Sequence, residues 1–348
     1  MLITMTLNGK KVADDVAADT LLIDFVRNHG CLSVKRGCET ANCGLCTVFM
    51  DEKPVLSCSV LAARASGHTI TTLEGLQGEA AEFGAFIADQ GAEQCGFCNP
   101  GFMMNAIALF REKQDPTDEE IKEYLAGNLC RCSGYEGQLR GIRAYLDWKK
   151  QRDASITELT FPFSYRPGQK ELAAMVYHTV EKGKRLFVEA PTGVGKTIST
   201  VFPAIKAMGE EVCDRIFYLT AKTITRTVAE DCFELLGKQK LLFKTLTITA
   251  KEKMCVMDTV SCNPGECERA KGHYNRVNEA VYDMLIHEHK MSRDMIEKYA
   301  EKHQVCPFEM ALDAALFADA VICDYNYVFD PNVYLKRFFS EEEKGDYI

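Results

Sequence analysis

The chain has 348 residues, of which 47% are hydrophobic and 26% charged, a composition typical of a soluble globular protein with two or more domains. Its 16 cysteines do not indicate secretory disulfides, because the chain is long and opens without a signal peptide, so we expect a reducing, cytoplasmic setting. The net charge of -9 gives no general reason to expect nucleic-acid binding, and no apolar run is long enough for a membrane role.

The first 78 residues predict a small β-grasp domain. Apolar and polar residues alternate around an Asn-Gly pair, which is a strong hairpin signal, and a stretch with helical periodicity follows. The helix should have a polar N-cap and a glycine stop. The expected elements are a hairpin over residues 2–16, a helix over residues 20–28 capped by Asp19 or Thr20 and ended by Gly30, a strand pair flanking residues 51–54, and a last strand over residues 70–73.

The first candidate metal site is a set of four cysteines separated by four residues, then two, with a distant fourth. This spacing matches the plant-type 2Fe-2S ferredoxin loop, in which a tight turn lets thiolates and backbone amides converge on the inorganic sulfides. Gly37 and Gly44 supply that freedom. A structural zinc site is the alternative, although zinc knuckles usually repeat the two-residue gap in both halves. The predicted ligands are Cys38, Cys43, Cys46 and Cys58.

Residues 79–146 predict a helical domain around a second set of four cysteines. Residues 102–111 are strongly apolar after a Pro-Gly pair, and Thr117 and Glu120 have the spacing of a capping box. Cysteines at helix N-termini have their thiolate charge favoured by the helix dipoles. Zinc is again the alternative, although a single-residue gap is tight for a tetrahedral site. The predicted ligands are Cys95, Cys98, Cys130 and Cys132.

Four stretches carry a family resemblance: Lys35-Arg-Gly-Cys38-Glu-Thr-Ala-Asn-Cys43-Gly-Leu-Cys46-Thr-Val, Leu56-Ser-Cys58, Gln94-Cys95-Gly-Phe-Cys98-Asn-Pro-Gly101 and Asn128-Leu-Cys130-Arg-Cys132-Ser-Gly-Tyr135. Over about residues 1–146 the chain resembles the iron-sulfur subunit of the molybdenum hydroxylases, the family of xanthine dehydrogenase and carbon monoxide dehydrogenase. The resemblance implies two 2Fe-2S clusters that pass single electrons from a molybdopterin subunit to a flavin (FAD) subunit. It also implies that Gln94 lies against the pterin.

A phosphate-binding loop is expected in the second half. Residues 187–197 predict a short apolar strand, a glycine loop with alanine in its first glycine position, and the start of a helix over residues 198–208. Backbone amides of this loop would face the β-phosphate of ATP, Lys196 would reach the β- and γ-oxygens, and Thr197 would ligate Mg²⁺. A chance match to the pattern is the alternative. The predicted nucleotide-binding residues are Gly193, Gly195, Lys196 and Thr197, with Gln169 in a stretch that looks like an adenine-reading glutamine motif.

Residues 216–223 and 246–251 are expected to be strands of a RecA-like parallel sheet, followed by a cysteine-bearing insertion at about residues 251–310. Four cysteines again suffice for one cluster. The His287-Glu-His289 stretch is expected to be a solvated helical face rather than a metal pair. The predicted ligands are Cys255, Cys262, Cys267 and Cys306, while Cys31, Cys213, Cys232 and Cys323 are expected to be small core residues.

Four features of the second half carry another family resemblance: the phosphate-binding loop (the Walker A motif, residues 187–197), residues 218–227, the third cysteine set and Asp324-Tyr-Asn-Tyr327. Over about residues 147–348 the chain resembles the iron-sulfur superfamily 2 DNA helicases of the XPD and DinG type. The resemblance implies a 4Fe-4S cluster beside a channel for single-stranded DNA. The chain ends at Ile348, before the Asp-Glu-Ala-His motif of that family, so we expect ATP binding without hydrolysis and assign no catalytic residue. Candidate phosphate contacts are Arg226, Lys251, Lys253, Arg269 and Lys271, although a solvated surface explains lone basic residues equally well.

The expected fold class is α+β followed by α/β: a 2Fe-2S β-grasp domain over residues 1–78, a helical 2Fe-2S domain over residues 79–146 and an incomplete RecA-like domain over residues 147–348. Two functions stay open. One is an electron-transfer subunit of a molybdenum-hydroxylase-type oxidoreductase fused to an ATP-binding helicase-like domain. The other is a fragment of an ATP-dependent DNA helicase that carries a redox domain. Because no flexible linker marks the junction, we expect a fusion or truncation product, and whether the chain is itself an enzyme stays open.

Overall fold

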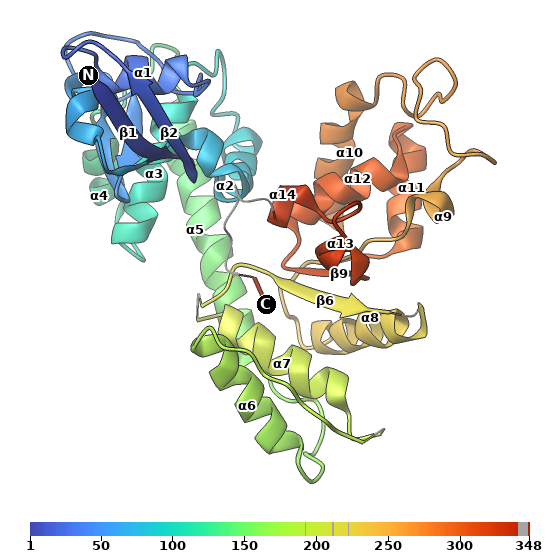
Figure 1. Cartoon of the computed structure of the whole chain (residues 1–348). Coiled ribbons are helices and arrows are strands. Elements are labelled where there is room, and N and C mark those ends of the chain that lie inside the picture. Colours follow the sequence, from blue (N-terminus) through green and yellow to red (C-terminus); the bar gives the residue numbers. More distant parts are fainter. Residues whose placement is uncertain (192, 211, 222, 340–346) are drawn as a thin grey trace. The chain divides into compact units, whose positions relative to one another are not determined.

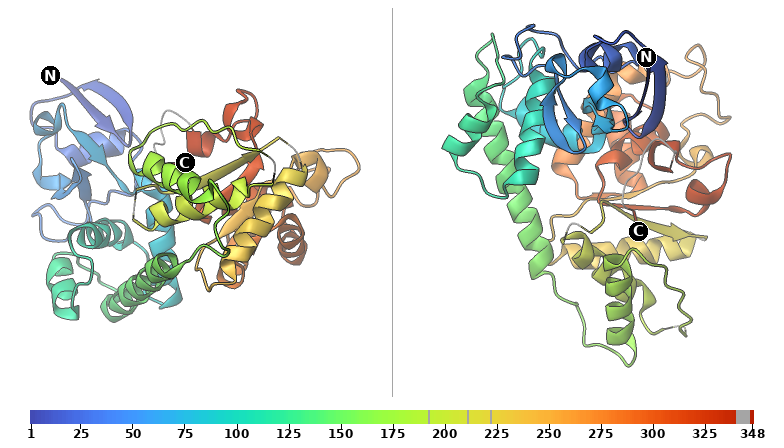
Figure 2. Two further views of the ribbon diagram at one scale, coloured as in Figure 1. Left: turned by 90° about the horizontal axis from the view of Figure 1, so that it is seen from below. Right: turned by 60° about the vertical axis from the view of Figure 1, so that its left-hand side comes forward.

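A computed structural model of the protein describes residues 1–191, 193–210, 212–221, 223–339 and 347–348. The chain forms two compact units, the first mainly Met1–Lys149 and the second mainly Lys150–Phe338 (Figure 1 and Figure 2). Each unit has hydrophobic clusters of its own. Among the described residues, we find no helix with the length and apolarity of a membrane span.

The first unit opens with β1 (Leu2–Leu7), β2 (Lys10–Asp15), α1 (Leu22–Asn28), β3 (Thr47–Met50), β4 (Lys53–Leu56) and β5 (Thr69–Thr71). The five strands form one sheet in the order β2-β1-β5-β3-β4, in which β5 runs parallel to β1 and antiparallel to β3. Asn8 and Gly9 have φ angles of 49° and 81°, as a tight antiparallel hairpin requires. The predicted hairpin and the strand pair around residues 51–54 are both confirmed.

Helix α1 begins later than expected, and neither Asp19 nor Thr20 caps it. Leu21 occupies the cap position, and its side chain makes no capping hydrogen bond. The physical reason is tertiary pairing, because Leu21 forms an antiparallel β-bridge with Leu61 and its backbone stays extended up to the first helical residue. The expected stop is confirmed, since Gly30 follows the helix at a φ angle of 90°.

Strand β5 ends two residues earlier than the expected strand over residues 70–73. The backbone N–H of Thr72 donates to Oδ1 of Asn8 at 2.8 Å, so it leaves the ladder of the sheet. Residues Leu73–Gly75 then form a 3₁₀ turn. A side chain from the first hairpin therefore ends the strand.

The rest of the first unit is helical, with α2 (Gln77–Asp89), α3 (Asn99–Glu112), α4 (Asp118–Leu125) and the beginning of α5 (Tyr135–Glu158). Its core contains packed aromatic rings, among them Phe83 and Tyr145, whose ring centroids are 5.3 Å apart. The predicted capping box of α4 is confirmed. The N–H of Glu120 donates to Oγ1 of Thr117 at 3.2 Å, and the N–H of Thr117 donates to Oε2 of Glu120 at 2.8 Å.

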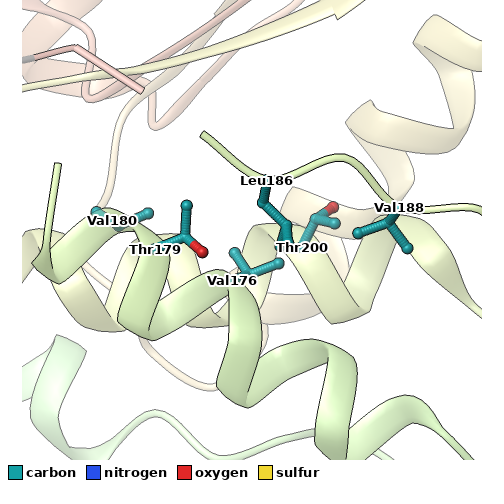
Figure 3. A pocket seen from close by; sticks show the side chains of 6 residues that line it. All are labelled: Val176, Thr179, Val180, Leu186, Val188 and Thr200. Atoms are coloured by element: carbon teal, nitrogen blue, oxygen red, sulfur yellow. The ribbon is translucent and has the colours of Figure 1, made fainter. Parts of the chain in front are cut away.

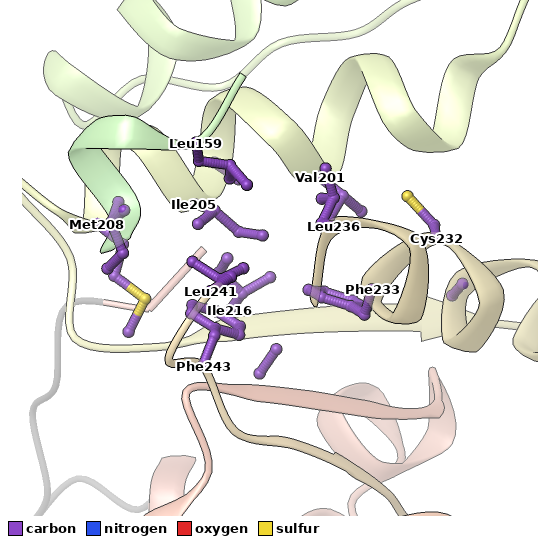
Figure 4. Close-up of a cluster of buried hydrophobic side chains, with 14 of the residues drawn as sticks. Leu159, Val201, Ile205, Met208, Ile216, Cys232, Phe233, Leu236, Leu241 and Phe243 are labelled. Atoms are coloured by element: carbon purple, nitrogen blue, oxygen red, sulfur yellow. The ribbon is translucent and has the colours of Figure 1, made fainter. Parts of the chain in front are cut away.

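The second unit is a parallel sheet covered by helices. Its elements are α6 (Gln169–Glu181), α7 (Lys196–Met208), β6 (Ile216–Thr220), α8 (Thr223–Gly237), β7 (Thr245–Thr247), α9 (Lys251–Met254), α10 (His273–His287), β8 (Lys290–Met291), α11 (Arg293–His303), α12 (Pro307–Ala314), β9 (Ala320–Asp324), α13 (Asn326–Phe329) and α14 (Lys336–Phe339). The strands are all parallel in the order β6-β9-β7-β8. Ile205 of α7, Leu236 of α8 and Ile216 of β6 meet in one buried cluster (Figure 4).

The apolar strand expected just before the glycine loop is not formed. Residues 184–191 have no regular structure, and the side chain of Phe187 is 92% exposed. The edge of β6 that faces away from β9 pairs instead with Ile348. The N–H of Phe217 donates to the carbonyl of Ile348 at 2.6 Å, and the N–H of Ile348 donates to the carbonyl of Arg215 at 3.1 Å. This pairing occupies the edge of β6 that the predicted strand would need.

Three further predictions do not concern the candidate ligands. The cysteines expected in hydrophobic cores are all buried, and burial raises the pKa of Cys232 and of Cys323 to about 12. His287 and His289 are exposed, as expected for a solvated face. The predicted helix after the glycine loop is also confirmed, as α7.

Candidate metal centres

The four cysteines of the first set lie in two pairs. The loop between α1 and β3 carries Cys38, Cys43 and Cys46, and Cys58 lies in a short turn after β4. Cys38 and Cys43 lie close enough for each thiol to shift the pKa of the other, and Cys58 lies close enough to Cys46 to shift the pKa of Cys46. The two pairs are close enough for the charge on Cys58 to act on Cys43. The structure therefore gathers all four predicted ligands.

Backbone amides and burial act in opposite directions on these thiols. N–H groups of Thr40 and Asn42 hydrogen-bond to the sulfur of Cys38 and lower its pKa to about 6. Burial raises the pKa of Cys46 to about 11, and it also raises the pKa of Cys43. A buried thiolate requires a compensating positive charge, and iron bound by the thiolates supplies it.

The second set also forms two pairs. Cys98 immediately precedes α3, and Cys132 lies shortly before α5. The sulfur atoms of Cys95 and Cys132 are 3.5 Å apart, and the thiol of Cys98 is hydrogen-bonded to that of Cys130. Burial raises the pKa of Cys98 to about 11, whereas a backbone N–H of Phe97 lowers the pKa of Cys95.

Two pairs of thiols per set fit a binuclear cluster better than a single zinc ion. In a 2Fe-2S cluster four cysteines hold two irons, whereas a tetrahedral zinc site requires four ligands around one point. The geometry therefore favours the predicted 2Fe-2S clusters over the zinc alternative at both sets.

A buried asparagine, which the sequence analysis names only as part of a family stretch, connects the two sets. Asn128 is 6% exposed, and its Nδ2 donates to the carbonyl of Gly44 at 3.3 Å while its Oδ1 accepts from Nδ2 of Asn105 at 2.6 Å. The N–H of the next residue, Leu129, donates to the carbonyl of Cys43 at 3.0 Å. The only signal in the sequence was the position of Asn128 two residues before Cys130, which carries no chemistry by itself.

Close backbone packing holds the first loop against the helical domain. Gly44 has a φ angle of 69°, and a Cβ atom on it would lie 2.5 Å from Nδ2 of Asn128. A Cβ atom on Gly101, at the start of α3, would lie 2.8 Å from Cα of Leu45. Both positions therefore require glycine.

The second set lies at the surface of its unit. Gln94 and Cys95 are exposed, and so are three neighbouring apolar or aromatic side chains, Phe97, Leu129 and Tyr135. Tyr135 is nevertheless anchored, because its hydroxyl accepts from the N–H of Cys130 at 2.8 Å. Gln94 therefore lies in an open position beside the second set.

The predicted nucleotide-binding residues of the second unit lie around one loop, although Thr192 within it is outside the described residues. Gly193 and Gly195 have φ angles of 87° and 76°. Nζ of Lys196 donates to the carbonyl of Ala190 at 2.9 Å, so the lysine folds back over the loop. The hydroxyl of Thr197 accepts from that of Tyr218 at 3.4 Å.

Gln169 is held against this loop rather than in an open adenine site. Its side chain is 5% exposed, and its Oε1 accepts from the N–H of Arg166 at 2.7 Å. A Cβ atom on Gly195 would clash with the Gln169 amide nitrogen. The guanidinium of Arg166 in turn donates to the carbonyl of Gly193.

A pocket of about 300 Å³ lies near this loop, between α6, α7 and residues 184–191 (Figure 3). Its lining is aliphatic except for two threonine side chains, and it contains no charged group. We therefore assign no phosphate to it. The lining residues are Val176, Thr179, Val180, Leu186, Val188 and Thr200.

The third cysteine set is gathered only in part. Cys262 is exposed and hydrogen-bonded to Lys251, whose charge also acts on the thiol of Cys306. Cys306 caps α12, and the N–H of Cys306 donates to Nδ1 of the buried His273 at 3.3 Å. A cation, a helix N-terminus and a buried imidazole around these thiols suit an anionic group, so the residues present fit an iron-sulfur cluster. His273 was another residue that the sequence analysis did not single out.

Two of the basic residues proposed as DNA contacts are engaged within the unit. Lys251 also forms an ion pair with Glu309 at 3.3 Å. Arg269 donates to the carbonyl of Ala300 at 2.9 Å and forms an ion pair with Glu301. Both side chains therefore have structural partners, whereas Lys253 is exposed.

Three family models match the chain. Residues 5–71 match a 2Fe-2S iron-sulfur cluster binding domain, residues 72–143 match a [2Fe-2S] binding domain, and residues 231–343 match the DEAD_2 family. The first two ranges contain all eight cysteines of the first and second sets. The third range contains all four of the third set.

Two of the proteins similar to the first unit are iron-sulfur subunits of dehydrogenases. The nicotinate dehydrogenase small FeS subunit of Eubacterium barkeri is 42% identical over 136 residues, which are 38% of this chain and 87% of that protein. The xanthine dehydrogenase iron-sulfur-binding subunit of Escherichia coli O157:H7 is 42% identical over 138 residues, 38% of this chain and 87% of that protein. The chain therefore spans most of the length of both relatives.

Among solved structures, quinoline 2-oxidoreductase from Pseudomonas putida 86 is 37% identical and covers 43% of this chain and 96% of its own, with a TM-score of 0.40. We draw nothing about the fold from a likeness at that score. The sequence identity, the two family models and the paired cysteines all concern the same N-terminal stretch. Through this stretch, the chain belongs to the family of 2Fe-2S iron-sulfur subunits of molybdenum hydroxylases.

Proposed function

We propose that the first unit carries electrons between a molybdopterin subunit and an FAD subunit of a hydroxylase complex. The observation that carries this proposal is the pairing of eight thiols into two binuclear ligand sets joined through Asn128. Each 2Fe-2S cluster, when bound, supplies a one-electron carrier. The chain itself contributes the ligands, the amides that favour thiolate, and the packing that fixes the spacing of the two loops.

The surface around the second set supports docking of the molybdopterin subunit there. Phe97 is 47% exposed beside Cys95, and Gln94 offers an amide that can hydrogen-bond to a pterin. Exposed aromatic and aliphatic side chains around a polar group are typical of the centre of a protein interface. In this proposal Gln94 touches the cofactor and Phe97 is buried against the partner subunit.

Co-purification tests the proposed partners. An affinity-tagged chain isolated from its native host should carry molybdenum and FAD, measured by mass spectrometry and by flavin fluorescence. Phe97→Asp should remove both, because it places a charge in the interface, while its iron content stays unchanged. The matched control Leu32→Asp, at an exposed apolar side chain of the β-grasp domain, should retain both. Wild-type chain free of molybdenum and flavin would contradict the proposal.

For the second unit we propose a helicase-like domain that binds ATP with Mg²⁺, holds a 4Fe-4S cluster in the third cysteine set and contacts single-stranded DNA. The DEAD_2 match, the all-parallel sheet and the glycine loop in front of α7 support this proposal. They also favour the alternative function, an ATP-dependent DNA helicase fragment that carries a redox domain. DNA-stimulated phosphate release by the chain would select the alternative.

A further inference from the structure

A buried histidine in the second unit has one ring nitrogen without a partner. His273 is the first residue of α10 and is 4% exposed. Its Nδ1 accepts the N–H of Cys306 at 3.3 Å. Across the residues that the structure describes, no hydrogen-bond partner lies within reach of its buried Nε2.

The hydrogen bond at Nδ1 determines what Nε2 can do. Because Nδ1 accepts a hydrogen bond from a backbone N–H, the neutral imidazole must carry its own proton on Nε2. A protonated Nε2 cannot coordinate a metal, so His273 is not a further ligand but a donor. Buried donors are rarely left unsatisfied, and an acceptor is therefore expected beside this ring.

The neighbouring carboxylates do not fill this role. Glu309 and Asp313 both lie on α12 and influence His273 electrostatically, as does Arg276 on its own helix. Glu309, however, is paired with Lys251, and Asp313 accepts from Arg337 at 2.8 Å. Neither carboxylate bonds to Nε2, so neither supplies the missing acceptor.

The third cysteine set supplies acceptor chemistry close to His273. The ring lies against the backbone of Cys306, and Cys267 is six residues before His273 in the chain and is also buried. Thiolates and cluster sulfides both accept N–H hydrogen bonds, and such bonds are one of the means by which proteins set cluster potentials.

We propose that the Nε2–H of His273 donates a hydrogen bond to a sulfur atom of the 4Fe-4S cluster in the third cysteine set. This inference rests on the cluster proposed for the second unit. His273 is then a positioning residue that acts on the cluster without coordinating it. The hydrogen bond stabilises the reduced cluster, which carries more negative charge, and so raises its midpoint potential.

The first test uses the wild-type full-length chain and does not depend on the folding of a variant. The chain is labelled with ¹⁵N-histidine, reconstituted anaerobically, reduced, and studied by pulsed EPR at the 4Fe-4S signal. We expect coupling to one histidine nitrogen and to a proton that exchanges in D₂O. A 4Fe-4S signal without either coupling would overturn the inference.

The second test measures midpoint potentials. His273→Phe removes the donor and should lower the 4Fe-4S potential, whereas His273→Gln keeps an N–H donor and should restore part of the shift. His289→Phe, an exposed histidine in the same unit, is the matched control and should change nothing. The two 2Fe-2S clusters of the same chain serve as internal references. An unchanged 4Fe-4S potential in His273→Phe contradicts the inference.

Failure of the cluster and failure of the hydrogen bond give different results. If iron analysis of the reconstituted chain gives only about four atoms per chain, the amount in two 2Fe-2S clusters, the proposed 4Fe-4S cluster is wrong. The inference about His273 is then wrong as well. If the cluster forms but lacks the histidine coupling, only the inference is wrong.

Discussion

At the scale of single residues, Asn128 links the β-grasp part of the first unit to its helical part. Its side chain joins the first cysteine loop, at Gly44, to α3, at Asn105. The backbone of Leu129 adds a hydrogen bond to Cys43. The position of Cys130, which follows directly, therefore depends on the first loop as well as on its own helix.

We predict that Asn128→Ala lowers the free energy of unfolding by about 1–3 kcal/mol, because it removes the partner of the half-buried Asn105 amide and one of the hydrogen bonds to the buried carbonyl of Gly44. Denaturant unfolding followed by circular dichroism measures this change. The second-set cluster should also be lost more readily than the first. Asn28→Ala, at an exposed residue of the same unit, should have little effect, and an equal loss in both variants would contradict the role given to Asn128.

A second residue-scale prediction concerns Lys196. Its ammonium group already lies over the glycine loop, where it donates to Ala190, and in the proposed function it moves to the phosphates of ATP. Lys196→Ala should weaken ATP binding at least tenfold in calorimetric titrations with Mg²⁺, the loss of roughly 1.4 kcal/mol. The exposed Lys170→Ala should bind like the wild-type chain. Equal affinities for Lys196→Ala and wild type would rule out this loop as the nucleotide site.

At the scale of elements, the N-terminus of α4 depends on its capping box. Lys113 and the N–H of Thr117 lower the pKa of Glu120 to about 2. A lowered carboxyl pKa means that the stabilisation is complete above the unfolded-state pKa, about 4.3, and is lost as the pH falls through about 2.

We therefore predict that Glu120→Ala lowers the free energy of unfolding at pH 7 and lowers it by less in acid. Thr117→Ala should lower it by about 1 kcal/mol at both pH values, because the hydroxyl that accepts from the N–H of Glu120 does not titrate. Denaturant titrations at pH 7 and near pH 2 measure the difference. Thr69→Ala, an exposed substitution in β5 of the same unit, serves as the control for a general effect of losing a threonine. A Glu120→Ala effect that grew in acid would contradict the capping arrangement.

The elements also show what sequence patterns determine. The hairpin at Asn8, the capping box at Thr117 and the helix after Lys196 follow from local chemistry, and the structure confirms them. The limits of α1 and β5 depend on pairing with distant residues, so local patterns misplace them. The apolar run at Phe187 has the composition of a strand, but Ile348 is hydrogen-bonded to the free edge of β6.

At the scale of the whole molecule, the candidate sites also combine features that local sequence determines with features that depend on contacts between distant residues. Cysteine spacing predicts twelve ligands in three sets, because spacing is a property of the chain. It could not predict that the thiols lie in pairs, that Asn128 connects two loops or that His273 lies against Cys306. Each of these features is made by residues far apart in the sequence, and only the folded backbone brings them together.

EPR spectroscopy of the reduced full-length chain, with iron and zinc analysis, tests the central claim most directly. At temperatures where only 2Fe-2S clusters give sharp signals, we predict two distinguishable species. Cys43→Ser should remove one of them and Cys95→Ser the other, because the two residues belong to separate ligand sets. Zinc in place of iron, a single species, or loss of both signals in either variant would contradict the assignment of two independent 2Fe-2S clusters to the first unit.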